Sequence, residues 1–184
     1  MKTLVKKYKS VIRFILTFLL VYGGLSLTYK LYLDMSQEKD YHPDYITNLI
    51  SRQCQVLLES LGHEAQVIPH DGEASIKLIL NDEYVARVIE GCNGVSAIIL
   101  FSAFVIAFSW HWKATVLYVF TGAVVIYAVN LMRIVVLALG LYYYPTERDL
   151  LHGVIFPMII YGMVFLLWML WVNRFKKINK KYVV

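Results

Sequence analysis

Three side chains that carry reactive or charged groups stand in or beside long apolar runs of this sequence: Cys92, Arg133 and His152. Each belongs to a different apolar run. A thiol supplies a nucleophile, a guanidinium stabilises negative charge, and an imidazole carries protons near neutral pH. These are the groups that a cysteine peptidase or transpeptidase requires. Whether they act together depends on the elements that position them.

The composition indicates an integral membrane protein. Of the 184 residues, 59% are hydrophobic and 17% are charged, and the mean hydropathy is +0.57. A soluble domain of this size needs more polar surface. The net charge of +5 is not a nucleic-acid signature, because the basic residues gather at the two ends beside apolar runs. We therefore expect the chain to contact a lipid bilayer and no nucleic acid.

Four apolar segments are long enough to cross a bilayer, which requires about 20 residues. They cover residues 11–33, 93–109, 114–141 and 153–172, and the second, at about 17 residues, lies at the short end of the range. No small-residue cleavage site clearly follows the first segment, so we expect a retained helix there. The sequence predicts an all-α polytopic membrane protein with about four transmembrane helices.

The charges predict how this bundle is oriented. Five basic residues lie before or at the start of the first segment and five follow the last, and an even number of spans puts both tails on one side. The positive-inside rule makes that side cytoplasmic, so all 13 acidic residues fall outside. The basic residues are Lys2, Lys6, Lys7, Lys9, Arg13, Arg174, Lys176, Lys177, Lys180 and Lys181.

This topology divides the chain into four parts. Residues 1–33 form a basic cytoplasmic tail and the first span, and residues 34–91 form an extracytoplasmic segment. Residues 92–172 form a three-span catalytic core, and residues 173–184 form a second basic cytoplasmic tail.

The outer segment is too long for a simple connector. Residues 43–61 have the pattern of an amphipathic helix, and residues 75–80 and 84–90 have the pattern of a β-hairpin that turns at residues 81–83. A small α+β insertion is therefore expected between spans 1 and 2. Its last strand leads directly to Cys92.

The predicted topology brings the three reactive groups near the outer surface. Cys92 stands at the outer end of the second span, where the N–H groups of a helix N-terminus favour a thiolate. Arg133 lies roughly 30 Å along the third span, within an apolar run, where a charge is costly and usually faces the bundle interior. Asn130 shares the helix face of Arg133. His152 opens the fourth span.

Each of these residues also has a simpler interpretation. Cys92 taken alone is an ordinary small apolar residue, Arg133 is a charge that reaches the headgroups, and His152 is an interfacial histidine. Cys54 faces an oxidising compartment in this topology, which leaves open a disulfide with Cys92.

Two histidine–carboxylate pairs carry groups that can bind a metal ion. His63-Glu64 and His70-Asp71 match no established zinc spacing, so solvated loops are the expected structure. We expect neither a metal nor another cofactor.

Three short motifs, taken in order, resemble the exosortase/archaeosortase family. They are Glu90-Gly91-Cys92-Asn93-Gly94 at the head of one span, Asn130-Leu131-Met132-Arg133 within the next, and His152-Gly153 at the head of the last. The likeness covers about residues 75–171, and the short chain resembles the compact XrtF type.

The resemblance implies a membrane cysteine transpeptidase in the bacterial cytoplasmic membrane, with its site facing outside. Such enzymes act on secreted proteins whose C-terminal sorting tail has a short motif, a hydrophobic helix and a basic end. They are thought to cleave near the motif and to transfer the protein to a surface acceptor. These secreted proteins and the acceptor are the partners that the resemblance implies.

The motifs also carry the family's residue roles onto this chain. Cys92 matches the nucleophile, Arg133 the conserved arginine and His152 the conserved histidine. Three neighbours are expected to support them: Asn130, Asn93 and Gly94. Larger family members have more spans, and many read Cys-Ser-Gly at the nucleophile, so the substrate-binding helices are not carried over.

Two other functions remain open from the residues themselves. In a non-enzymatic scaffold or assembly subunit, Arg133 is a structural charge and the outer segment is a docking surface. In a small transporter, Arg133 binds an anionic substrate and Cys92 is dispensable. The sequence has no interrupted-helix pair or inverted repeat in support of a transporter.

Overall fold

The computed structural model describes residues 8–36, 43–109, 111–147 and 150–182. The backbone of His152 lies within this part, but its side chain does not. Of the basic residues singled out above, Lys2, Lys6 and Lys7 lie outside the described residues, as do the side chains of Lys176, Lys177, Lys180 and Lys181.

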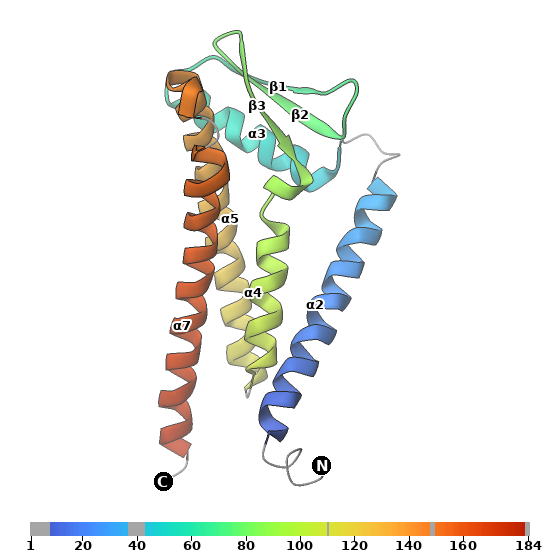
Figure 1. The fold of residues 1–184 in the computed structure, drawn as a ribbon, viewed down its shortest axis with the longest axis vertical. Coiled ribbons are helices and arrows are strands. Elements are labelled where there is room, and N and C mark those ends of the chain that lie inside the picture. Colours follow the sequence, from blue (N-terminus) through green and yellow to red (C-terminus); the bar gives the residue numbers. More distant parts are fainter. Residues whose placement is uncertain (1–7, 37–42, 110, 148–149, 183–184) are drawn as a thin grey trace.

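Apolar helices form a bundle beneath a small layer of mixed structure (Figure 1). The helices are α2 (Lys9–Ser36), α4 (Val95–Ala107), α5 (Trp112–Tyr143) and α7 (Phe156–Tyr182). Among the described residues, α2, α5 and the stretch Gly153–Arg174 of the last helical segment are long and apolar enough to cross a membrane. The chain is thus a mostly helical, multi-pass membrane protein, as its composition predicts.

The prediction of four full-length spans is not confirmed, because α4 is short. This helix has 13 residues, or about 20 Å at 1.5 Å per residue, against a bilayer core of about 30 Å. The residues expected to open the span, Asn93 and Gly94, belong to a turn instead. Gly94 has a φ of 79°, and the helix begins only at Val95.

The layer above α4 contains one helix and one sheet. The helix is α3 (Tyr45–Ser60), and the strands are β1 (Ala65–Pro69), β2 (Ser75–Leu80) and β3 (Glu83–Ile89). We call these four elements the outer layer. The predicted helix and hairpin are both present, while β1 was not predicted. Five residues ending in a proline carry too little alternation to indicate a strand.

The strands are antiparallel in the order β1-β2-β3, so β1 and β3 form the two edges of the sheet. Asn81 and Asp82 connect β2 to β3 with φ values of 48° and 65°. Two consecutive positive φ angles are what a tight two-residue hairpin turn requires, and asparagine and aspartate tolerate them best after glycine.

A buried carboxylate ties the outer layer to α2. Asp44 caps the N-terminus of α3, where its Oδ1 accepts hydrogen bonds of 3.0 Å from the backbone N–H groups of Ile46 and Thr47. The hydroxyl of Tyr32, near the outer end of α2, donates to the same oxygen at 3.2 Å. The start of α3 is therefore held against the first span.

The outer half of α5 packs against the outer layer rather than lipid. Its buried side chains join the apolar faces of α3 and the sheet in one core. This core explains why an apolar run continues past Arg133 towards the end of α5. Its buried members are Ile50, Cys54, Leu58, Ala65, Leu78, Leu80, Val88, Ile134, Val135 and Ala138.

A second core lies deeper, among α4, α5 and α7. Phe101 of α4 is fully buried there, and its ring occupies the space that a side chain at Gly122 of α5 would fill. A Cβ at position 122 would lie 2.3 Å from two ring atoms of Phe101. The glycine is needed at this position because the two helices approach so closely.

Replacement of Gly122 by alanine should therefore destabilise the bundle. Overpacking of this kind costs about 1–3 kcal/mol, so the thermal unfolding midpoint in detergent should fall clearly. Gly162→Ala in α7 is the matched control, since a Cβ there meets nothing within 4 Å. Equal thermal midpoints for the two variants would contradict the proposed packing.

Candidate functional site

Cys92 lies in a short turn between the sheet and the membrane bundle. The turn is a 3-10 helix over Glu90–Cys92, which follows β3 at once, and α4 begins at Val95. The backbone N–H of Asn93 donates to the carbonyl of Glu90 at 3.2 Å. The thiol is half-buried. The expectation that a strand leads to Cys92 is confirmed, but Cys92 lies in this turn, two residues before the N-cap Gly94 of α4, rather than at the helix N-terminus itself.

The side chain of Asn93 anchors this turn to three other elements. It is 1% exposed, and its Nδ2 donates to the hydroxyl of Tyr29 in α2 at 2.7 Å and to that of Thr47 in α3 at 3.2 Å. Its Oδ1 accepts from the N–H of Val95 at 3.0 Å, which caps α4. The sequence did not indicate Tyr29 or Thr47, because nothing in a linear pattern pairs them with a turn so far along the chain.

Asn130 connects Cys92 to Arg133 through its side-chain amide. Its Nδ2 donates to the Cys92 carbonyl at 2.8 Å, and its Oδ1 accepts from Nη1 of Arg133 at 3.3 Å. The amide is fully buried. Gly94 lies against it, with a Cβ at that position placed 3.0 Å from Cγ of Asn130. Both its positive φ and this contact require glycine.

The guanidinium of Arg133 has donors to spare. Its Nε is buried without a hydrogen-bond partner. In the described part of the chain the two ion pairs are Lys77–Asp71 and Arg87–Glu73, so no carboxylate there neutralises Arg133. Burial makes an unpaired charge costly, and an arginine presents its donors in a fork that suits an anion. The site is thus prepared to receive negative charge.

Two cavities meet at Cys92 and Arg133. The outer cavity, of about 230 Å³, lies between β3 and α5 and is lined by Arg87, Val88 and Leu137, among others. The membrane cavity, of about 290 Å³, lies between the Cys92 turn, α4, α5 and α7, and its lining includes Asn130, Pro157 and Tyr161. Cys92 and Arg133 line both spaces.

The backbone of His152 lies in a π-helical turn over Leu151–Ile155, directly before α7. Pro157 follows within the first turn of α7. It lacks the N–H that would bond to the carbonyl of Gly153, which suits a locally widened helix. Pro157 also lines the membrane cavity. Because the imidazole lies outside the described side chains, its place beside Cys92 stays a prediction.

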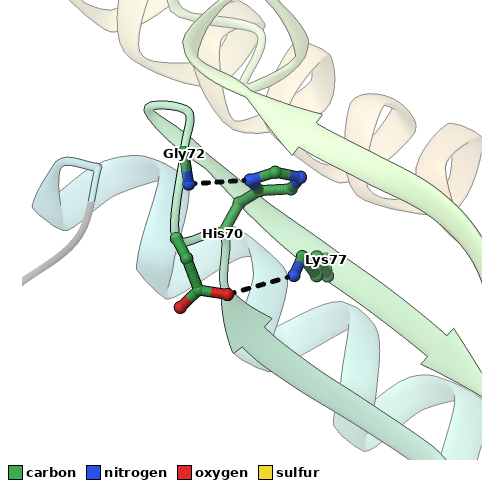
Figure 2. Close-up of polar contacts among 4 residues, drawn as sticks. His70, Gly72 and Lys77 are labelled. Atoms are coloured by element: carbon green, nitrogen blue, oxygen red, sulfur yellow. Dashed lines mark hydrogen bonds and ion pairs between the residues drawn. The ribbon is translucent and has the colours of Figure 1, made fainter.

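His70 and Asp71, one of the two histidine–carboxylate pairs, make polar contacts in the turn between β1 and β2 (Figure 2). Nδ1 of His70 accepts a hydrogen bond of 3.2 Å from the backbone N–H of Gly72. The carboxylate of Asp71 pairs with Nζ of Lys77 at 3.4 Å. These contacts give both residues a structural role.

His63 joins the outer layer to the end of α5. It forms a hydrogen bond of 3.4 Å with Nδ2 of Asn81, and its ring meets those of Tyr142 and Tyr143 edge-on. Among the described residues, no group of three or more histidine, cysteine, aspartate or glutamate side chains is placed to hold a metal ion.

The structure contains Cys54 and Cys92 as free thiols, and therefore no disulfide joins them. Cys54 is fully buried in the core between α3 and α5. This burial raises the pKa of the Cys54 thiol to about 12. Cys54 is thus protonated at neutral pH and shielded from reagents, whereas Cys92 lines two cavities.

Comparison with known proteins identifies the family. The family model described as "Transmembrane exosortase (Exosortase_EpsH)" matches residues 10–173. No curated protein and no solved structure matches the chain. The match does not distinguish the XrtF type, which stays a prediction. It covers all but the two ends of the chain, including Cys92, Arg133 and His152, and the chain therefore belongs to the transmembrane exosortase family.

Proposed function

We propose that this exosortase is a cysteine transpeptidase, which cleaves the C-terminal sorting tail of secreted proteins and transfers them to a surface acceptor. Membership of a family of cysteine transpeptidases supports this function. The observation that carries it is the junction of two cavities at Cys92 and Arg133, which Asn130 links to each other. Transfer requires that the substrate and the acceptor both reach one nucleophile. Two cavities that both have Cys92 in their lining provide the space for this.

In the first half of the reaction, the Cys92 thiolate attacks the scissile carbonyl carbon. Negative charge moves onto the carbonyl oxygen, and the free donors of Arg133 stabilise it, an effect worth about 3–4 kcal/mol in comparable oxyanion sites. The C–N bond then breaks and leaves a thioester on Cys92. His152 protonates the departing amine.

In the second half, an acceptor nucleophile attacks the thioester. His152 takes its proton, the C–S bond breaks, and the Cys92 thiolate is released as the secreted protein is joined to the acceptor. When water replaces the acceptor, the same steps give hydrolysis. Asn130 acts as a positioning residue, because it holds the Cys92 carbonyl and Arg133 at once.

We further propose that the bundle crosses the bacterial cytoplasmic membrane four times, with α4 as the short crossing. Both basic tails then lie in the cytoplasm and the site opens outside. A sorting tail carries its own hydrophobic helix, so it arrives within the membrane plane. This route brings its cleavage site to the membrane cavity, which α4, α5 and α7 border.

The Cys92 thiol should react selectively with an alkylating reagent in the native protein. At pH 8, labelling in detergent should modify Cys92 and leave Cys54 intact, because burial raises the pKa of Cys54 to about 12 and keeps it protonated. Peptide mapping by mass spectrometry checks this result. Labelling of Cys54 at the same rate would contradict the buried core between α3 and α5.

The guanidinium of Arg133 should speed alkylation of Cys92. In a Cys54→Ser background at pH 8, Arg133→Ala should lower the rate at which Cys92 is labelled, because a nearby cation stabilises negative charge on the attacking sulfur. Arg52→Ala is the charge-matched control, since Arg52 lies exposed on α3 and lines neither cavity. If both variants were labelled at the parent's rate, Arg133 would have no part in activating the thiol.

Processing of a secreted reporter that carries a sorting tail should depend on Cys92 and on Arg133. Cys92→Ala should abolish processing, and Arg133→Ala should slow it about 10²–10³-fold, the loss seen when one oxyanion donor is removed. Both variants should still insert and fold, as size-exclusion profiles in detergent would check. Normal processing by both variants would favour a non-enzymatic scaffold or assembly subunit. Impaired function of Arg133→Ala with normal function of Cys92→Ala would favour a small transporter.

A further inference from the structure

β3 is an edge strand that runs directly into the candidate site. In the sheet order β1-β2-β3 it pairs with β2 on one side only. Its last residue, Ile89, is followed at once by the turn that holds Cys92. Figure 1 shows that β3 points down towards the top of α4.

The outward edge of β3 presents backbone groups that have no backbone partner among the described residues. Along an edge strand, every second residue turns its N–H and C=O away from the neighbouring strand. In the described part of the chain, β2 is the element whose backbone bonds to residues 83–89. Such an edge is a template for a further extended chain.

The outer cavity lies along this strand. Four consecutive residues of β3 line it, Ala86, Arg87, Val88 and Ile89, and the opposite wall comes from α5. Arg133 and Cys92 close the end nearest the turn. Arginines are hydrogen-bond donors only, and this suits the row of carbonyl oxygens of an extended peptide.

We propose that the substrate segment beside the scissile bond binds as a fourth strand along the free edge of β3. This inference rests on the proposed function, because it assigns the outer cavity to the polypeptide substrate. Main-chain hydrogen bonds to β3 align the segment, and alternate side chains enter the outer cavity. The strand direction then brings the scissile carbonyl to Cys92. The membrane cavity holds the hydrophobic part of the tail, which leaves after cleavage and frees this cavity for the acceptor.

Proline substitutions test the pairing. Ala86 and Arg87 are adjacent in β3, so one has its N–H directed at β2 and the other has it directed at the free edge. Proline is tolerated in a strand when the missing N–H faces outwards. We therefore expect one of the two variants, Ala86→Pro or Arg87→Pro, to keep the thermal unfolding midpoint of the parent, because its missing N–H faces outwards. We call it the tolerated β3 variant. Its rate of reporter processing should fall about tenfold or more.

The other edge of the same sheet supplies the matched control. Gln66 and Val67 are adjacent in β1, which lies on the far side of β2. One of Gln66→Pro and Val67→Pro should likewise keep the parent's thermal midpoint. This tolerated β1 variant should process the reporter at the parent's rate. Equal processing by the tolerated β3 and β1 variants would overturn strand addition, even while Cys92→Ala still abolished processing. The proposed function would stand in that case.

Cross-linking gives a second readout that does not depend on proline being tolerated. In a Cys54→Ser, Cys92→Ala background, Arg87→Cys is combined with reporters that carry single cysteines at successive positions before the cleavage site. A paired strand should form disulfides at every second reporter position, because neighbouring side chains point to opposite faces. Gln66→Cys in β1 should form none. Uniform or absent cross-linking at Arg87→Cys would overturn the proposal.

Discussion

Polar groups buried in a bundle that lipid surrounds must find their partners within the protein, and two asparagines meet that requirement around Cys92. The amide of Asn130 bonds to the carbonyl of Cys92 and to the guanidinium of Arg133. The amide of Asn93 bonds to Tyr29 of α2, to Thr47 of α3 and to the first N–H of α4. Helices α2, α3, α4 and α5 are therefore all connected to the turn that carries the thiol. Loss of either amide would leave buried donors or acceptors without partners, at about 1–3 kcal/mol each.

The short helix α4 follows from the same arrangement. Because the Cys92 turn descends to meet Asn130, α4 begins below the outer end of α5, and the outer layer occupies the space above it (Figure 1). The outer half of α5 then buries its apolar side chains against α3 and the sheet. This burial encloses Cys92 and Arg133 beneath the outer layer, while both residues line two cavities. A full-length second span would have carried Cys92 to the end of the bundle, away from Arg133.

Arg133 accounts for most of the electrostatic character of the site. The Nε of Arg133 is buried without a partner, and no carboxylate among the described residues pairs with its guanidinium. Both features lower the free energy of unfolding. Such a cost is reasonable where negative charge appears during a reaction, since a thiolate or an oxyanion would supply the missing partner.

By itself, the sequence determined those features that depend on local pattern. Apolar length predicted the helices α2, α5 and α7, alternation and turn residues predicted the hairpin of β2 and β3, and the spacing of Asn130 and Arg133 predicted that they share a helix face. Tertiary structure decided the rest, because it depends on contacts between distant segments. Such contacts shorten α4, pair Ala65–Pro69 with β2 as a third strand, and bring Tyr29 and Thr47 to Asn93. They also bring the amide of Asn130 to the carbonyl of Cys92. No repeating pattern in the sequence indicates that these two distant residues form a hydrogen bond.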